Sequence, residues 1–174
     1  MRMNIALVGL MGTGKTTVAQ ILAARLTLPA VDLDALIEAR EGMAITEIFQ
    51  RRGEAYFRDI EARIVEEQSR RGGKIIACGG GVVLRPENLV HLRRQGVIVC
   101  LQARPEVILE RTRGSSQRPL LNVPDPLETI RQLQQARQAY YAQADYTVDT
   151  SDSCPDRVVD AILQWCRERG DEQA

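Results

Sequence analysis

The amino-acid sequence predicts an α/β protein with three layers, α/β/α, in which helices cover both faces of a five-stranded parallel sheet. The first observation is that short apolar runs alternate with segments of helical periodicity along the 174 residues. The second is that the first apolar run leads directly into a glycine-rich turn and then into a helical segment. The length is typical of one domain, so we expect residues 1–174 to form a single domain.

The strands are predicted from five short runs rich in Val, Ile and Leu. These runs do not alternate between apolar and polar residues, as expected of parallel strands covered on both faces. They are Asn4–Val8, Ala30–Leu33, Lys74–Cys78, Val97–Leu101 and Tyr146–Asp149.

The helices are predicted from apolar residues that recur at helical spacing between these runs, with proline at the first turn of some segments and glycine after the end of another. The expected helices are Thr16–Leu26, Glu54–Arg70, Asn88–Gln95, Pro105–Thr112, Leu127–Ala142 and Pro155–Arg169, with a shorter one at Ile45–Phe49.

Residues 113–125 interrupt this alternation. They lie between two predicted helices and contain Gly114, Pro119 and Pro124, which disfavour regular structure. Long loops inside compact domains are usually functional, so we expect a mobile lid over about residues 113–125.

The overall composition excludes a general affinity for nucleic acid or for an anionic membrane. Basic and acidic residues number 23 each, so the chain carries no large net field. Aromatic residues make up 4% of the chain, too few for a surface that stacks bases. The expected partners are therefore small molecules, and bound anions must be held by local clusters of charge.

The cysteines and the histidine are not predicted to carry chemistry. Cys78, Cys100, Cys154 and Cys166 form no closely spaced pair, so we expect buried free thiols rather than zinc ligands or a disulfide. The only histidine, His91, lies on a predicted surface helix.

No targeting or membrane segment is predicted. The N-terminal apolar run ends in the glycine-rich turn and cannot serve as a signal sequence. No apolar stretch approaches the roughly 18 residues of a membrane span. We expect a cytoplasmic protein (stromal in a plant cell) and, because no long uncovered apolar face stands out, a monomer.

The residues from Gly9 to Thr16 fit the phosphate-loop pattern G-x-x-x-x-G-K-[ST] in the strand–turn–helix context that the pattern requires. Glycines such as Gly12 and Gly14, with Thr13 between them, let backbone N–H groups converge on phosphate oxygens, and the following helix adds its positive end. Lys15 is expected to bridge the outer phosphates, and the Thr16 hydroxyl to ligate Mg²⁺. The sequence therefore predicts binding of a nucleoside triphosphate by a phosphate-loop kinase fold.

Two carboxylates follow the second predicted strand. Asp32 and Asp34 sit one residue apart at the edge where ligands bind in such sheets. One carboxylate can hold Mg²⁺ through water, and the other can accept a hydrogen bond from an attacking hydroxyl. The simpler alternative is that Asp34 caps the helix that begins at Ala35; the two roles are compatible.

Three further features allow both a functional and a purely structural interpretation. The glycines Gly79, Gly80 and Gly81 follow a buried strand, where bare backbone would let a small ligand approach closely; a tight turn is the alternative. Arg58 and Arg137 lie on predicted helices, and each by itself is more typical of a solvated surface than of a binding site, Arg58 through an i,i+3 pair with Glu61.

The chain resembles the shikimate kinases, a branch of the nucleoside-monophosphate-kinase-like phosphate-loop enzymes, over roughly residues 3–163. The family's signature of a basic residue, a glutamate and a strand that ends in three glycines is satisfied. The matching residues are Arg58, Glu61, Val65, Ile75-Ile76-Ala77-Cys78 and Gly79-Gly80-Gly81, and further matches are Gly9 to Thr17, Asp32-Leu33-Asp34, Gly53-Glu54, Phe57, Arg118-Pro119-Leu120-Leu121, Arg137 and Tyr140.

The resemblance implies Mg²⁺-dependent transfer of the γ-phosphate of ATP to the 3-hydroxyl of shikimate, which gives shikimate 3-phosphate and ADP in aromatic amino-acid biosynthesis. It also implies a role for each matching residue. On the ATP side, the resemblance implies that Gly12, Thr13, Gly14, Lys15, Thr16 and Thr17 bind the phosphates, that Thr16 and Asp32 hold Mg²⁺, and that Arg118 is a lid arginine that contacts ATP and the transferred phosphate.

On the substrate side, it implies that Asp34 holds the ring hydroxyls and acts as a base. Arg58 and Arg137 bind the substrate carboxylate, and Gly79, Gly80 and Gly81 line the ring.

The same resemblance makes residues 34–62 a substrate-binding helical region. The chain departs from the family pattern at Ala44, where a capping serine is common, and the adenine-facing loop around Ser153-Cys154-Pro155 is variable. Arg111 is either a residue that stacks on adenine or an ordinary helix-surface residue. The alternative functions are another small-molecule kinase, such as a gluconate or nucleotide kinase, and a catalytically inactive binding module.

Overall fold

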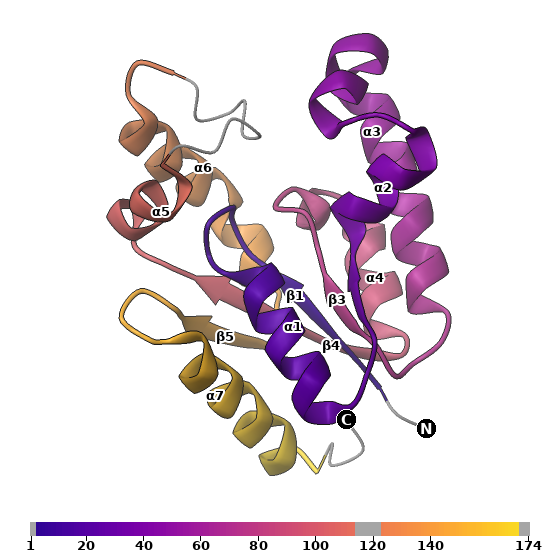
Figure 1. The fold of residues 1–174 in the computed structure, drawn as a ribbon, viewed down its shortest axis with the longest axis vertical. Coiled ribbons are helices and arrows are strands. Elements are labelled where there is room, and N and C mark those ends of the chain that lie inside the picture. Colours follow the sequence, from indigo (N-terminus) through magenta and orange to yellow (C-terminus); the bar gives the residue numbers. More distant parts are fainter. Residues whose placement is uncertain (1–2, 114–122, 171–174) are drawn as a thin grey trace.

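The computed structural model describes residues 3–113 and 123–170, which contain the five-stranded parallel sheet that the sequence predicts (Figure 1). The strand order is β2-β3-β1-β4-β5, and every neighbouring pair is parallel. The strands are β1 (Asn4–Val8), β2 (Ala30–Asp32), β3 (Ile75–Ala77), β4 (Gly96–Gln102) and β5 (Tyr146–Asp149).

Helices lie on both faces of this sheet, so the three-layer prediction is confirmed. One face is covered by α1 (Lys15–Leu26) and α7 (Pro155–Glu168). The other elements are α2 (Leu33–Glu41), α3 (Ile45–Ser69), the 3₁₀ turn η1 (Val82–Leu84), α4 (Pro86–Arg93), α5 (Pro105–Thr112) and α6 (Pro126–Tyr141).

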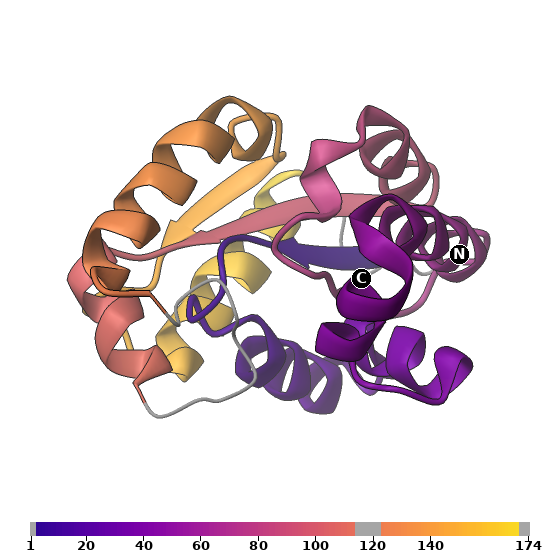
Figure 2. The ribbon, with the colours of Figure 1, turned by 90° about the horizontal axis from the view of Figure 1, so that it is seen from above.

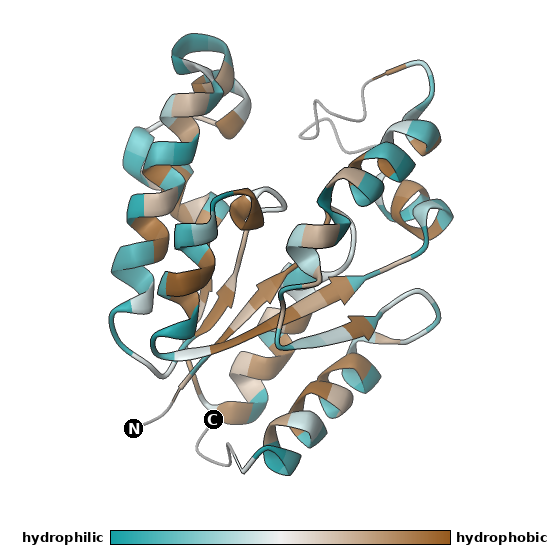
Figure 3. Ribbon diagram, turned by 180° about the vertical axis from the view of Figure 1, so that it is seen from behind, coloured by the Kyte–Doolittle hydropathy of each residue, from teal (hydrophilic) through white to brown (hydrophobic). Residues whose placement is uncertain are grey.

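Strand β1 explains why the sheet needs cover on both sides. Ile5 and Leu7 are fully buried and pack with α1 and α7, while Ala6 and Val8 are fully buried against the helices of the opposite face. Side chains alternate between the faces of a strand, so a strand with four successive apolar residues requires two layers of helices. The central strands are accordingly the most hydrophobic part of the ribbon (Figure 3).

Helix α3 contains a sharp kink at Gly53, whose φ and ψ are 82° and 168°. The kink separates the two helical segments that the sequence predicts, at Ile45–Phe49 and Glu54–Arg70. At the start of α3, Ala44 makes no side-chain capping hydrogen bond, because an alanine side chain has no acceptor. The second half of α3 packs on the core through its apolar stripe, which includes Phe57, Ile60 and Ile64.

Two groups of helices rise beyond the carboxyl ends of the strands. Helices α2 and α3 stand on one side and α5 and α6 on the other, with the loop between β1 and α1 between them (Figure 2). Ligands bind at this edge in open α/β sheets, so the arrangement positions a site between the two groups.

Most predicted element ends differ from the observed ends by at most two residues. Of the predicted lid, only Arg113 and residues 123–125 lie within the described residues, so the lid stays a prediction and Arg118 lies outside the described part of the chain. No helix in residues 3–113 and 123–170 is both long and apolar enough to cross a membrane.

Candidate active site

The phosphate loop joins β1 to α1, in the strand–turn–helix context that the motif predicts. Gly14 precedes α1 with φ 93°, and a side chain added there would meet nothing within 4 Å, so its backbone faces open space. At Gly12 (φ 76°), a methyl group would lie 2.8 Å from Cγ2 of Thr112, which brings the loop against the end of α5. Both positions therefore require glycine, one for its conformation and one also for close packing.

Lys15 lies over the loop that precedes it. Its Nζ donates hydrogen bonds of 2.9 Å to the carbonyl oxygens of Gly9 and Leu10. Thr13, 1% exposed, donates from its hydroxyl to the same Leu10 carbonyl at 2.8 Å. These contacts hold the ammonium group beside the backbone of the phosphate loop, where it can bind an anionic phosphate. Thr17, the last residue assigned to the phosphate cradle, is exposed in the first turn of α1.

Asp32 connects the phosphate loop with α2. Its Oδ1 accepts hydrogen bonds from the backbone N–H groups of Asp34 (3.0 Å) and Ala35 (3.2 Å). Its Oδ2 accepts a hydrogen bond of 3.2 Å from the Thr16 hydroxyl. The capping alternative for Asp34 was therefore wrong, because the helix cap is Asp32. The strand correspondingly ends at Asp32, one residue earlier than predicted.

Asp34 lies in the first turn of α2, not at the end of the strand. Its Oδ1 would be 2.7 Å from a methyl group placed on Gly79, so the carboxylate faces the glycine run after β3. Burial raises the pKa of the Asp34 carboxyl, and the charge of Asp32 raises it further. The positive charges of Lys15 and Arg58 act in the opposite direction.

The three glycines leave space that protein side chains fill. A methyl group on Gly79 would lie 3.1 Å from Oε1 of Glu61 as well as against Asp34, and one on Gly81 would lie 2.6 Å from Cζ of Arg58. The sequence suggests that a ligand approaches this backbone closely; in the structure, the charged side chains of the protein itself do so. A tight turn alone does not account for this crowding.

Arg58 is held by carboxylates of its own helix. Its Nη1 donates to Oε2 of Glu61 at 2.7 Å, and its Nε and Nη2 both lie 3.3 Å from Oε1 of Glu54. The Arg58 side chain is 14% exposed and that of Glu61 is 1% exposed, so this is not the surface pair of the structural alternative. The spacing of Arg58 and Glu61 was visible in the sequence, but the burial of Glu61 depends on packing against the glycine run.

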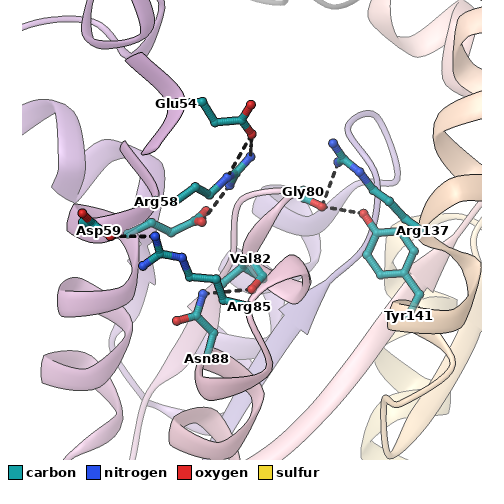
Figure 4. A network of polar contacts seen from close by, with 10 residues as sticks. Glu54, Arg58, Asp59, Gly80, Val82, Arg85, Asn88, Arg137 and Tyr141 are labelled. Atoms are coloured by element: carbon teal, nitrogen blue, oxygen red, sulfur yellow. Dashed lines mark hydrogen bonds and ion pairs between the residues drawn. The ribbon is translucent and has the colours of Figure 1, made fainter. Parts of the chain in front are cut away.

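Arg137 reaches the same glycine run from the opposite side. Its Nη1 donates to the carbonyl oxygen of Gly80 at 3.0 Å, and the Tyr141 hydroxyl donates to the same oxygen at 2.6 Å. Figure 4 shows Arg58 and Arg137 approaching from two different helices with Gly80 between them. Sequence reasoning missed Tyr141, although its position one helical turn after Arg137 was a usable signal.

Arg111 contacts the protein backbone near the phosphate loop. Its Nη2 donates to the Thr150 carbonyl at 2.6 Å, and its Nη1 donates to the Thr150 hydroxyl at 3.1 Å. Thr150 is buried, and its hydroxyl lies 3.0 Å from the carbonyl oxygen of Thr13. Arg111 therefore connects the end of α5 to β5 and the phosphate loop, which neither sequence interpretation anticipated.

The cysteines and the possible metal ligands are the remaining candidate groups. Cys78, Cys100 and Cys166 are buried and outside any disulfide, as predicted, whereas the predicted burial of Cys154 was wrong because it is exposed at the start of α7. In the described part of the chain there is no group of three or more His, Cys, Asp or Glu side chains that could hold a metal ion. The Thr16–Asp32 pair, a hydroxyl and a carboxylate beside the phosphate loop, has the hard oxygen donors that suit Mg²⁺ together with phosphate oxygens and water.

Comparison with known proteins gives a consistent result. The family model described as shikimate kinase matches residues 11–167. A shikimate kinase of Caldanaerobacter subterraneus subsp. tengcongensis is 47% identical, over 92% of this chain and 94% of that protein. Another, of Symbiobacterium thermophilum, is 46% identical, over 97% and 99%.

Solved structures agree with the sequence comparisons. The shikimate kinase from Acinetobacter baumannii in complex with shikimate has a TM-score of 0.93 and 35% identity, covering 97% of this chain and 95% of that one. A gluconokinase from Sinorhizobium meliloti has a TM-score of 0.65 and 16% identity and shares the fold. On the family match, the identities and the fold, this chain belongs to the shikimate kinase family.

Proposed function

We propose that this protein transfers the γ-phosphate of ATP to the 3-hydroxyl of shikimate and releases shikimate 3-phosphate and ADP, within aromatic amino-acid biosynthesis. Shikimate kinases are ATP-dependent, Mg²⁺-requiring kinases that act on a hydroxyl of shikimate. The observation that carries the proposal is that Arg58 and Arg137, from α3 and α6, approach the Gly80–Gly81 backbone beside the phosphate loop. Two guanidinium groups around one space suit the single carboxylate of a small acid.

The phosphate side of the site is assigned to residues 12–17. Backbone N–H groups of Gly12 to Thr17 bind the phosphate oxygens, and Lys15 exchanges its contacts with the Gly9 and Leu10 carbonyls for the outer phosphates. Thr16 and Asp32 would hold Mg²⁺, which would supply positive charge to the phosphate oxygens. With this assignment, Oδ1 of Asp32 keeps its hydrogen bonds to the backbone N–H groups at the start of α2.

The acceptor side is assigned to Asp34, the two arginines and the glycine run. The arginines fix the carboxylate of the acid, so that its ring lies against Gly79, Gly80 and Gly81 and one hydroxyl points at the γ-phosphate. Asp34 accepts the proton of that hydroxyl as the new oxygen–phosphorus bond forms and the bond from the γ-phosphorus to the bridging oxygen of ADP breaks. Its raised pKa makes it a better proton acceptor than an exposed carboxylate.

The proposed organisation is one domain, residues 1–174, with a lid at about 113–125 and a substrate-binding helical region at about 34–62. Arg118 of the lid is proposed to contact ATP and to stabilise the transferred phosphate. We also propose that the protein acts in the cytoplasm as a monomer, without nucleic-acid or membrane partners. Its mass in solution, measured by light scattering during gel filtration, tests the monomer.

The function is tested by turnover with ATP, Mg²⁺ and each of three acceptors: shikimate, gluconate and AMP. We expect product only with shikimate. Lys15→Ala should abolish turnover with unchanged circular dichroism, and Arg58→Ala should raise the KM for shikimate while the KM for ATP changes little. Turnover of another acceptor with none of shikimate would contradict the proposal.

A further inference from the structure

All three nitrogens of the Arg58 guanidinium already contact glutamate oxygens in this structure, and the single N–H of Nε is among the donors in use. Glu61 takes Nη1 at 2.7 Å, and a single oxygen of Glu54 lies 3.3 Å from both Nε and Nη2. A guanidinium group binds a carboxylate in two parallel contacts only where two adjacent nitrogens are available. Glu54 occupies the edge formed by Nε and Nη2, so a substrate carboxylate that binds Arg58 through this edge must displace Glu54.

The two glutamates differ in how easily they can be displaced. The Glu61 side chain is 1% exposed, so breaking its contact would leave a charge without water. The Glu54 side chain is 62% exposed, and its contacts with Arg58 are longer, so it can move into solvent at little cost. Glu54 also directly follows the kink at Gly53, at the start of the second half of α3.

Charge favours the same exchange. Within the described residues, Arg137 makes no ion pair and contacts the neutral Gly80 carbonyl, whereas Arg58 faces two carboxylates. In Figure 4 the Glu54 carboxylate lies beside Arg58, toward the space across which Arg137 stands. Asp34 faces the same glycine run as Glu61, so an incoming carboxylate joins three carboxylates near the two arginines, and withdrawal of Glu54 reduces the repulsion.

We propose that Glu54 is an affinity- and specificity-determining residue, because its carboxylate stands in for the substrate's carboxylate on Arg58 until the substrate displaces it. The inference rests on the proposed function, since it takes the ligand to be a small organic acid. Glu54 weakens the binding of any ligand that contacts Arg58, because it competes for the same guanidinium group. Its negative charge also repels anionic ligands, which weakens their binding further. Removing its charge should strengthen binding, and more for an acid than for its neutral ester.

The test compares Glu54→Gln with a matched control. Glu66 pairs with Arg70 at the same i,i+4 spacing and the same 3.3 Å, on the same helix but away from the glycine run, so Glu66→Gln removes an equivalent exposed pair. Binding of shikimate and of shikimate methyl ester is measured by calorimetry without nucleotide. We expect Glu54→Gln to lower the Kd for shikimate by about two- to fivefold, with a smaller gain for the ester, and Glu66→Gln to change neither.

Three results would overturn the role of Glu54: weaker shikimate binding by Glu54→Gln, unchanged binding, or an equal gain for acid and ester. Weaker binding would mean that Glu54 orients Arg58 for the substrate instead of competing with it. Thermal unfolding of both variants shows whether either change disturbs the fold. If the unaltered protein binds no shikimate, the proposed function fails; if it binds and only the variant pattern differs, the inference about Glu54 alone fails.

Discussion

The Tyr141 hydroxyl donates a hydrogen bond of 2.6 Å to the carbonyl oxygen of Gly80, the same atom that accepts from Nη1 of Arg137. Tyr141 is 5% exposed, and burial raises the pKa of its hydroxyl to about 12, so the group remains a donor at any physiological pH. The two donors lie one helical turn apart on α6. They fix the direction of the Gly80 carbonyl and the position of Arg137 together.

Replacing Tyr141 by phenylalanine should therefore weaken substrate binding. Among the described residues, Arg137 would be the one side chain still donating to the Gly80 carbonyl, which holds that guanidinium away from the acid. We expect a KM for shikimate about fivefold higher, a KM for ATP little changed, and a loss of about 1 kcal/mol of unfolding free energy. Tyr140→Phe is the control, because the Tyr140 side chain packs on the same core. A change in stability with no change in the KM for shikimate would leave Tyr141 a structural residue only.

Gly81→Ala should act through Arg58. The φ of Gly81 is −99°, so alanine fits the backbone, but its methyl group would lie 2.6 Å from Cζ of Arg58 and displace the guanidinium. We expect the KM for shikimate to rise about 10- to 100-fold, the range for losing a charged bidentate contact. In an Arg58→Ala background the same change should have little further effect. A full additional loss there would show that Gly81 acts independently of Arg58.

Asp34→Asn should lower the turnover rate and raise the free energy of unfolding at neutral pH. A carboxyl whose folded-state pKa is raised binds more protons in the native state than in the unfolded state, so its contribution to stability falls as the pH rises from its ordinary value of about 4 to the raised one. The variant lacks this penalty. It should unfold at higher denaturant than the unaltered protein at neutral pH, and the difference should shrink as the pH falls to about 4. Turnover should fall by about 100-fold or more if Asp34 is the base.

A pH-independent difference in stability between the two proteins would indicate that Asp34 is not titrating in this range. Turnover retained in Asp34→Asn would instead assign that residue to positioning of the hydroxyl, without proton acceptance.

Two substitutions of Asp32 separate its contacts. Asp32→Ala removes both the α2 cap and the contact with Thr16, whereas asparagine can still cap through its carbonyl oxygen. We expect Asp32→Ala to lose about 0.5–2 kcal/mol of unfolding free energy and Asp32→Asn only a small part of that. Both should need more Mg²⁺ for half-maximal turnover. Unchanged Mg²⁺ dependence in both variants would exclude Asp32 from the metal site.

Local sequence was sufficient for the sheet and for the phosphate loop. The runs at Ile5–Val8 and Val97–Leu101 are apolar at successive positions, which is typical of strands covered on both faces. The loop from Gly9 to Thr16 depends on residue types at fixed spacing, and such patterns specify a backbone shape without distant contacts. Capping of this helix by Asp34, the alternative interpretation, was wrong because the cap is Asp32; two carboxylates one residue apart give nearly the same local signal.

Tertiary structure decided what the individual side chains do. Arg58 and Glu61 have the spacing of an ordinary surface pair, and only the packing of α3 against the glycine run buries Glu61 and brings Arg58 beside Gly81. Tyr141 and Gly80 are 61 positions apart in the chain, so no local pattern could connect them. Local chemistry fixes which elements form, but the burial and partners of a charged group depend on segments that meet only after the chain has folded.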